Sequence, residues 1–459
     1  MAEMYLALWW CLVSVILANA QPVCDNGASG CQCRRYSDEI TGLAKIVAKC
    51  SGLNLIQFPD ITKFTEDVNV LDLNLNNIEI LDTPISSESV TRIILSHNRI
   101  NFVDVNFFKS LPELRLLDLS YNNITSLEGG DIFSTLTNLY YLNLAYNNLK
   151  VLPDGIFEPL HALTHLDLSN NPLGPFLMNS KDVLAETLAI NSNITHLALN
   201  NVEVSDLHPD YFSIFIRLEY LDMADNEFNL IPLVPYSVEH LDLSGNNLTF
   251  LSAKYLNYHS LKYLKLSRMP SLTNVHHYAF YNLQSLESLI ITDCTNLKNF
   301  TELAFGIPSK TLSAFPKYLS LARNGLTSIN ESYKYLFRKM DHIDLRYNPW
   351  KCNCDLLWLQ EFDGELLQSS EIRCSSPKVL RHRSVMDLNQ LDLQQCYPEI
   401  YGKPSHRILI VVLMAVIILL IGFIFYLVKY PKTWLKPNRI GISPYSPYNP
   451  APLEEPNRH

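Results

Sequence analysis

An 11-residue phrase that recurs along the chain limits its possible folds more than any other feature. It reads L-x-x-L-x-L-x-x-N-x-L, with clear copies in LRLLDLSYNNI (114–124) and LYYLNLAYNNL (139–149). Most copies start 20 to 25 residues after the previous one, and a period of this size is typical of a solenoid. The two longer steps, 163 to 194 and 286 to 316, are expected to carry surface loops. The copies start at Val68, Val90, Leu114, Leu139, Leu163, Ile194, Leu218, Val238, Leu261, Leu286, Pro316 and Met340.

Each copy predicts a short strand followed by an inward turn. In LRLLDLSYNNI, Leu117 and Leu119 alternate with their neighbours, so we expect these two side chains inward and the flanking positions, Ser120 included, outward. Asn122 follows the strand, and a buried asparagine there can satisfy backbone groups of adjacent coils. The same position, which we expect to stack as a ladder, is occupied by Asn98, Asn147, Asn171, Asn226, Asn246, Asn324 and Asn348.

An aromatic residue stands six positions before many of the copies. One coil cannot bury its own apolar face, so this ring is expected to fill the convex side between neighbouring coils. These residues are Phe108, Phe133, Phe157, Phe212, Tyr255 and Phe280.

The repeated phrase resembles the leucine-rich repeat family, and the resemblance covers most of the chain. It implies an α/β-type solenoid, a horseshoe of about twelve repeats with a parallel β-sheet on its concave face. Cysteines before and after the repeats resemble the disulfide caps of extracellular members, although His382 replaces a glycine usual in the C-terminal cap. The resemblance implies the pairs Cys24–Cys33, Cys31–Cys50, Cys352–Cys374 and Cys354–Cys396.

The spacing of the cysteines does not by itself determine how they pair within each cap. Four cysteines in each cap allow three pairings, and zinc is the alternative for C-x-C pairs, although an oxidising compartment disfavours it. Cys11 is expected to leave with a signal peptide, and Cys294 remains unpaired. Because Cys294 occupies the ladder position of its copy, we interpret it as a buried structural thiol rather than a reactive or dimer-forming one.

The two ends of the chain predict a type I single-pass protein of the plasma membrane, with its N-terminus extracellular. Residues 1–20 read as a signal peptide with an Ala-Asn-Ala cleavage site, and residues 408–428 carry no charge over a length that crosses a bilayer. Basic residues after this span favour a cytoplasmic C-terminus. The predicted segments are the signal peptide (1–20), N-terminal cap (21–66), repeats (67–350), C-terminal cap (351–397), stalk (398–407), transmembrane helix (408–428) and Pro-rich cytoplasmic tail (429–459).

Five Asn-x-Ser/Thr sequons in the outer part predict a glycoprotein. The acceptor asparagines are Asn123, Asn193, Asn247, Asn299 and Asn330.

Charge and motifs argue against several function classes. A formal net charge of -10, from 36 Lys and Arg against 46 Asp and Glu, is opposite to what a nucleic-acid binder needs. The chain has no G-x-S-x-G, H-E-x-x-H, P-loop or kinase signature, so we expect no enzymatic activity, cofactor or metal. His276 and His277 are adjacent on an irregular segment and do not form a metal site.

The concave face is the predicted binding surface. The outward position before the first strand leucine is often Tyr or His, and tyrosine is a frequent anchor of protein interfaces. The alternative is that these residues merely tolerate a sheet surface. Acidic residues of the seventh and eighth copies precede basic residues in the ninth, and this gradient can orient a partner. The candidate ligand-binding residues are Tyr141, His165, His196, Tyr220, His240, Tyr263, Lys265 and Arg268, with Tyr318 and His342 farther along the same face.

These features favour a cell-surface receptor or adhesion protein that binds an extracellular or cell-surface protein ligand in cell–cell recognition. The alternatives are an innate-immune co-receptor that lacks its own signalling domain and an auxiliary subunit of a membrane channel or receptor. The short tail cannot hold a Toll-type signalling domain, so a second membrane protein in cis is the expected co-receptor. Tyr445 and Tyr448, within SPYSPYNPAP (443–452), can dock an adaptor.

Overall fold

The computed structural model describes residues 24, 29–37, 44–65, 67–307, 315–362, 364–367, 371–389, 392–393 and 406–429. The predicted signal peptide, most of the stalk, Cys396 and the tail beyond Lys429 lie outside these residues. The chain divides into two units, Met1–Asp392 and Leu393–His459. The first contains the repeats and the second contains the apolar helix.

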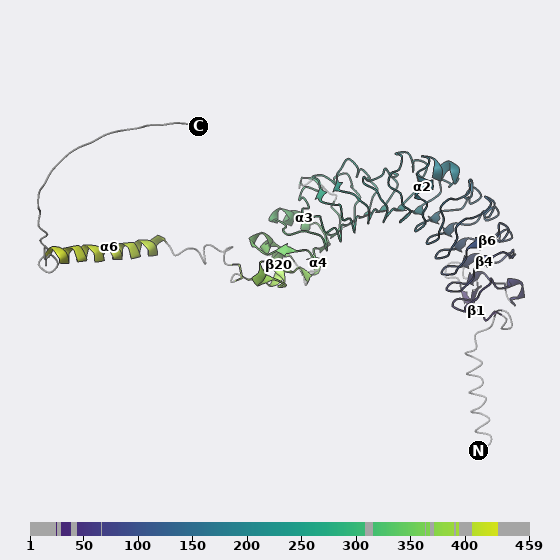
Figure 1. Cartoon of the computed structure of the whole chain (residues 1–459), viewed down its shortest axis with the longest axis horizontal. Coiled ribbons are helices and arrows are strands. Elements are labelled where there is room, and N and C mark those ends of the chain that lie inside the picture. Colours follow the sequence, from purple (N-terminus) through teal and green to yellow (C-terminus); the bar gives the residue numbers. More distant parts are fainter. Residues whose placement is uncertain are drawn as a thin grey trace, which may run out of the picture. The chain divides into compact units, whose positions relative to one another are not determined.

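One long sheet organises the repeat unit. Within the described residues it has 14 strands, in the order β1-β2-β3-β5-β7-β8-β9-β10-β11-β12-β14-β16-β17-β18. β1 (Gln32–Ser37) and β2 (Ala44–Lys49) form an antiparallel hairpin in the N-terminal cap, and β2 then pairs with β3 in parallel. The coils follow a curved path with this sheet along the inner side (Figure 1). The predicted leucine-rich repeat solenoid is therefore confirmed.

Every predicted copy supplies one strand of three residues, which starts two positions after the start of the copy. The central residue of each strand points into the core and is 0–2% exposed. The strands are β3 (Val70–Asp72), β5 (Arg92–Ile94), β7 (Leu116–Asp118), β8 (Tyr141–Asn143), β9 (His165–Asp167), β10 (His196–Ala198), β11 (Tyr220–Asp222), β12 (His240–Asp242), β14 (Tyr263–Lys265), β16 (Ser288–Ile290), β17 (Tyr318–Ser320) and β18 (His342–Asp344).

A residue with left-handed backbone follows each strand and turns the chain inward. This residue has φ between 50° and 74° in all twelve coils, although Gly occupies the position only once. Non-glycine residues avoid this conformation, at a cost of about 1–2 kcal/mol, unless other contacts compensate. The twelve residues are Leu75, His97, Tyr121, Tyr146, Asn170, Asn201, Asp225, Gly245, Arg268, Asp293, Arg323 and Tyr347.

In nine of the twelve coils the asparagine ladder provides that compensation, and its prediction is confirmed. Asn147 is typical: its Nδ2 donates to the carbonyls of Leu119 in the preceding coil (3.0 Å) and of Leu144 in its own coil (3.0 Å). Its Oδ1 accepts the backbone N–H of Ile124 (3.0 Å). One side chain thus satisfies three backbone groups in two coils, which water cannot reach.

Three coils have another residue at the ladder position: Val202, Met269 and Cys294. Cys294 is buried and unpaired, and its Sγ lies 3.5 Å from the carbonyl oxygen of Leu266 in the preceding coil. Burial raises the pKa of this thiol to about 11, which keeps it protonated and unreactive at neutral pH.

The predicted outward direction of Ser120 is wrong. The side chain is 4% exposed, because the chain has already begun to turn inward at this residue. Its hydroxyl donates to Asp118 Oδ1 (2.7 Å), and the backbone N–H of Ser120 donates to the same oxygen (3.0 Å). The aspartate of the strand therefore fixes the start of the turn.

Buried rings fill the convex side, as expected for five of the six predicted aromatics. Phe108, Phe133, Phe157, Phe212 and Phe280 are at most 2% exposed. Tyr255 is only half-buried. The preceding coil, between β11 and β12, is the shortest and leaves a hollow beside this ring.

Short elements complete the outer side of the repeats and the C-terminal cap. The minor strands are β4 (Ile80–Leu81), β6 (Phe102–Val103), β13 (Phe250–Leu251), β15 (Asn274–Val275), β19 (Trp350–Lys351) and β20 (Cys374–Ser376). The helical segments are η1 (Ile61–Lys63), α2 (Gly174–Leu177), η2 (Val183–Thr187), η3 (Glu331–Tyr333), α3 (Lys334–Phe337), η4 (Cys354–Glu361), α4 (Gly364–Leu367), η6 (Lys378–Leu380) and η7 (Val385–Asp387). α2 and η2 lie in the first of the two long steps, where a loop is expected.

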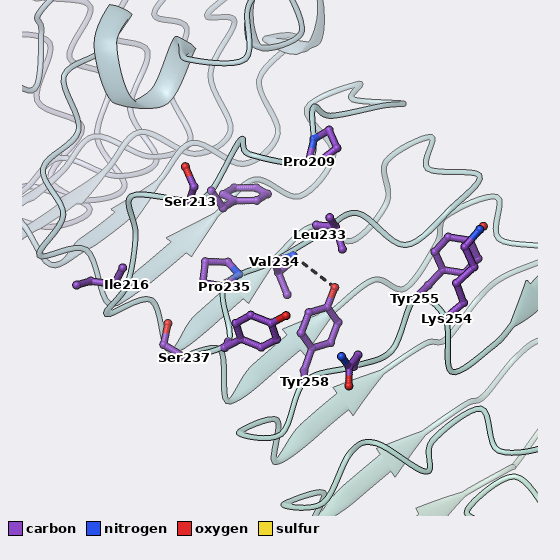
Figure 2. A pocket seen from close by; sticks show the side chains of 13 residues that line it. Pro209, Ser213, Ile216, Leu233, Val234, Pro235, Ser237, Lys254, Tyr255 and Tyr258 are labelled. Carbon is purple, nitrogen blue, oxygen red and sulfur yellow. Dashed lines mark hydrogen bonds between the residues drawn. The ribbon is translucent and has the colours of Figure 1, made fainter.

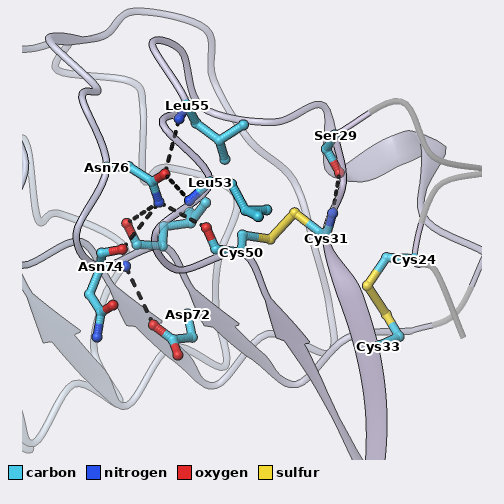
Figure 3. Close-up of a disulfide and its surroundings, with 11 residues drawn as sticks. Cys24, Ser29, Cys31, Cys33, Cys50, Leu53, Leu55, Asp72, Asn74 and Asn76 are labelled. Atoms are coloured by element: carbon cyan, nitrogen blue, oxygen red, sulfur yellow. Dashed lines mark hydrogen bonds between the residues drawn. A yellow bond between two sulfur atoms is a disulfide. The ribbon is translucent and has the colours of Figure 1, made fainter. Parts of the chain in front are cut away.

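Disulfides close both ends of the solenoid. The N-terminal cap contains Cys24–Cys33 and Cys31–Cys50 (Figure 3), the pairs that the family resemblance implies. Asn76, a ladder residue that is not among the predicted ones, joins this cap to the first coil. Its Nδ2 donates to the Cys50 carbonyl (2.8 Å), and its Oδ1 accepts the N–H groups of Leu53 and Leu55 (3.0 Å each).

The C-terminal cap contains the disulfide Cys352–Cys374. Cys354 is also disulfide-bonded, but its expected partner Cys396 lies outside the described residues. His382, which stands where a glycine is usual, has φ of 68°, the conformation that favours glycine.

The second unit contains helix α6 (His406–Lys429), which includes the predicted span 408–428. Its 24 residues reach about 36 Å at 1.5 Å per residue, enough to cross a bilayer. Among the described residues it is the one helix long and apolar enough to do so. The helix and the disulfides together indicate a membrane-anchored extracellular protein.

The ladder makes a testable prediction. Replacing Asn147 by leucine keeps the number and branching of the side-chain heavy atoms but leaves the Ile124 N–H and the Leu119 carbonyl without partners. Each buried unpaired group costs about 1–3 kcal/mol, so we expect Asn147→Leu to lower the free energy of unfolding by about 3 kcal/mol in guanidinium titrations. Asn148→Leu, at the exposed neighbouring position, should change it by less than about 0.5 kcal/mol. Equal stability of the two variants would contradict the role of the ladder.

Candidate binding face of the solenoid

Six aromatic side chains from six consecutive repeat strands form a continuous row on the concave face of the sheet, opposite the core. They occupy the first position of β8, β9, β10, β11, β12 and β14, and parallel pairing places each beside the next. Their ring centroids lie between 4.0 and 6.0 Å apart from one member to the next. We call these residues the ring row: Tyr141, His165, His196, Tyr220, His240 and Tyr263.

The ring row brings together all six aromatic candidates of the sequence prediction, and nothing interrupts them. Tyr318 and His342 lie on the same face but are separated from the row by Ser288. Tyr220 and Tyr263 are 37% and 41% exposed, while the other members are half-buried. Stacked rings lose little conformational freedom on binding, so the row is a rigid platform with polar tips.

The third position of these strands, together with that of β7 before them, forms a second row that is rich in carboxylates. It runs through Asp118, Asn143, Asp167, Ala198, Asp222, Asp242 and Lys265, and we call it the carboxylate row. In each aspartate, Oδ1 accepts the backbone N–H two residues later, at 2.8 to 3.0 Å. One oxygen therefore has a structural role in the turn, and the second remains for other partners.

Burial in the concave face changes the protonation behaviour of this row. It raises the pKa of Asp167, and the negative charge of Asp118 adds to the effect. The pKa of Asp222 is also raised by burial, with further contributions from Asp242 and Asp167. Both carboxylates are thus less well solvated than free aspartate. A cation placed beside either of them would stabilise its charged form.

The basic candidates, Lys265 and Arg268, face carboxylates of earlier coils. Lys265 Nζ lies 2.8 Å from Asp242 Oδ2 in the neighbouring strand. Arg268 binds both oxygens of Asp225 at 2.7 Å, and thus reaches across the intervening coil. That coil carries Gly245 at the crossing point, where an added Cβ would lie 2.0 Å from Asp225 Oδ1. These two cations therefore join coils to one another, and within the chain they neutralise Asp242 and Asp225 of the predicted gradient.

Two histidines of the ring row form a closely stacked pair. His165 and His196 have centroids 4.0 Å apart and interplanar angle 13°, and each Nδ1 lies within 2.9 Å of the hydroxyl of the preceding threonine. Burial lowers the pKa of both imidazoles. The proximity of His196 lowers that of His165 further, while Glu219 partly opposes the shift at His196. The neutral forms are therefore favoured in the folded protein.

Two other surface features were not predicted from the sequence. His97, Tyr121 and Tyr146 stack at the left-handed positions, with centroids 4.2 and 4.0 Å apart. They stack because the left-handed backbone at this position directs the side chains of successive coils along the same edge of the sheet. The aromatic residues directly before the ladder asparagine are the signal in the sequence.

The second of these features is an apolar hollow of about 470 Å³ on the outer side of the repeats, behind β11 and β12 (Figure 2). Leu233, Pro235 and Tyr236 line it, and Tyr258 donates its hydroxyl to the Pro232 carbonyl (3.2 Å). The short coil between β11 and β12 leaves this space, which also explains the partial exposure of Tyr255.

The remaining predicted sites lie at the surface. The five sequon asparagines, Asn123, Asn193, Asn247, Asn299 and Asn330, are all exposed, as glycosylation requires. No group of three or more potential metal ligands occurs among the residues that the structure describes.

Comparisons with known proteins agree with the repeat architecture. Family models described as leucine-rich repeat match residues 88–133, 129–173 and 237–257. Trophoblast glycoprotein of Macaca fascicularis is 27% identical over 284 residues, which is 60% of this chain and 57% of that protein. Transforming growth factor beta activator LRRC33 of Danio rerio is 25% identical over 68% of this chain and 44% of its own length. The chain thus spans about half the length of these two relatives.

Tsukushi of Gallus gallus is 25% identical over 70% of this chain and 78% of its own length. Among solved structures, the mouse RP105/MD-1 complex contains a chain with 22% identity and a TM-score of 0.49, and the match covers 74% of this chain and 53% of that one.

The histidine pair predicts a dependence of stability on pH. Because the folded-state pKa of both imidazoles is lowered, the unfolded chain binds protons more readily near pH 6, and stability should fall as pH drops below about 6.5. We expect the guanidinium midpoint of unfolding to decrease between pH 7.5 and 5.5 by less in the double variant His165→Gln and His196→Gln than in the wild type. The raised pKa values of Asp167 and Asp222 act in the opposite sense, but they are common to both proteins.

The matched control for this measurement is His277→Gln, an exposed residue away from the sheet, which should lose as much as the wild type. An equal loss in all three proteins would show that the stacked pair does not contribute.

Proposed function

The chain belongs to the leucine-rich repeat family, and on that premise we propose that it is a cell-surface receptor or adhesion protein that binds a protein ligand through the ring row. The observation that carries this proposal is the uninterrupted array of rings across six coils. Aromatic side chains, tyrosine above all, are favoured at the centres of protein interfaces. Cell–cell recognition through this face is the specific function that we propose.

The proposed topology is type I in the plasma membrane, with the repeats outside the cell. The length of α6, the extracellular type of disulfide caps and the exposed sequons support it. Basic residues Lys432, Lys436 and Arg439 follow the helix, in agreement with a cytoplasmic C-terminus. The Pro- and Tyr-rich tail then faces the cytoplasm, where an adaptor can bind it.

The second candidate function is an innate-immune co-receptor without a signalling domain of its own. Toll-like receptor 2 type-2 of Gallus gallus is 26% identical over 307 residues, which is 63% of this chain and 36% of that protein. A co-receptor of this kind acts with a signalling partner in the same membrane.

An aggregation assay tests the proposed adhesion. Suspension cells that express the full chain are mixed with dye-labelled cells that lack it. Aggregates among expressing cells alone mean homophilic adhesion, and mixed aggregates mean a heterophilic partner. We expect the triple variant of Tyr141, Tyr220 and Tyr263 to alanine to reduce aggregation at least tenfold at equal surface expression, because it removes three anchors of the ring row.

The matched control replaces three exposed tyrosines outside the concave face, Tyr236, Tyr281 and Tyr335, by alanine, and should aggregate like the wild type. Loss of aggregation in both triple variants would rule out a specific role for the ring row. Absence of aggregation by the wild type at normal surface display would overturn adhesion and favour the co-receptor or the auxiliary subunit.

A further inference from the structure

We propose that the concave face binds a positively charged side chain, arginine or lysine, of its protein partner in a gap above Ala198, between Asp167 and Asp222. This inference rests on the proposed function and specifies the chemistry of the ligand. It concerns one place on the face, where the ring row and the carboxylate row meet.

The gap is created by a small residue between two acids. Ala198 occupies the third position of β10, and in-register pairing places Asp167 of β9 on one side and Asp222 of β11 on the other. Parallel strands lie about 4.8 Å apart, so the two aspartates stand about 10 Å apart. The Ala198 methyl group lies between them in the sheet, and the side-chain amide of Asn200, from the same coil, contacts Asp222. A guanidinium whose N–H groups lie about 2.8 Å from an oxygen on each side fits this separation.

The other coils show what the gap lacks. Asp242 is paired with Lys265 from the adjacent strand (2.8 Å), and Asp344 is paired with Arg346 (2.8 Å). In both cases the chain supplies its own cation to an aspartate of the concave face. Among the ion pairs of the described residues, none includes Asp167 or Asp222.

Local hydrogen bonds leave the two aspartates available. Asp167 uses Oδ1 for the N–H of Ser169 (2.9 Å), which leaves its second oxygen for a ligand. Asp222 Oδ2 accepts from Asn200 Nδ2 (3.1 Å), which orients that oxygen without neutralising its charge. Glu219, which precedes β11 and is exposed, adds negative charge at the same place. The surface is therefore complementary to a cation.

The ring row provides the second half of the site. His196 and Tyr220, with centroids 5.6 Å apart, stand two residues before Ala198 and Asp222 on the same face. The aliphatic stem of a lysine or arginine can pack on these rings while its charged end reaches the carboxylates. An uncharged or acidic side chain gains the ring contact but loses the ion pairs. The face therefore selects a basic segment of the partner.

Binding of defined peptides tests the inference. The full chain in phosphatidylcholine nanodiscs is titrated with a fluorescent twelve-residue peptide of alternating arginine and serine, and with peptides in which glutamine or glutamate replaces arginine. We expect the arginine peptide to bind at least tenfold more tightly than the other two. The double variant Asp167→Asn and Asp222→Asn should remove this preference, while asparagine Oδ1 still accepts the backbone N–H groups.

Two substitutions of Ala198 separate charge from shape. Ala198→Arg supplies a cation within the chain, as Lys265 does for Asp242, and should weaken arginine-peptide binding at least tenfold with both aspartates intact. Ala198→Met, of similar length without charge, fills the same gap but leaves both carboxylates without a cation, so it should weaken binding less than Ala198→Arg does. Asp154→Asn with Asp210→Asn, two exposed acids outside the concave face, is the charge-matched control and should bind like the wild type.

The results distinguish this inference from the proposed function. Equal binding of the three peptides to the wild type, or an unchanged preference in the double aspartate variant, would overturn the cation site, whatever the aggregation assay shows. Selective arginine-peptide binding that depends on Asp167 and Asp222 supports the site even if expressing cells do not aggregate, and adhesion alone would then fail.

Discussion

The buried asparagine that follows nine of the twelve repeat strands is the interaction on which the rest of the structure depends. A coil with a three-residue strand must turn inward at once, and this turn exposes backbone N–H and carbonyl groups to an apolar interior. Asn147 and its equivalents pair those groups in two adjacent coils at the same time. The same bonds offset the cost of the left-handed residue before each asparagine, so non-glycine residues such as Tyr146 occupy that position.

This regular turn also decides what the surface can do. Because each coil repeats the same turn, equivalent positions of successive strands stand side by side in register. A residue type that recurs at one position of the repeat becomes a row on the sheet. Tyrosine and histidine at the first strand position form the ring row, and aspartate at the third position forms the carboxylate row. The binding face is thus a consequence of the periodicity that builds the core.

Electrostatics then distinguishes parts of that face from one another. In the ninth coil, Lys262, Lys265 and Arg268 each pair with an acid of an earlier coil, so this region is neutral and held together by ion pairs. Gly245 leaves the space that the Arg268–Asp225 pair needs. Asp167 and Asp222 have no such partner within the described residues, and burial raises the pKa of both. The same residue type therefore stabilises the fold through an ion pair in one coil and has no cation beside it in another.

The sequence by itself determined the solenoid, the start of all twelve strands, the ladder and the apolar helix, because each depends on a pattern local to one segment. Tertiary structure decided the rest. Whether Lys265 and Arg268 face a ligand or an acid depends on which coil lies beside them, and the inward direction of Ser120 depends on where the turn begins. The continuity of the ring row likewise depends on register between residues 20 to 31 positions apart in the chain. Such relations arise only when the coils stack, since stacking brings charges and rings from different repeats within contact distance.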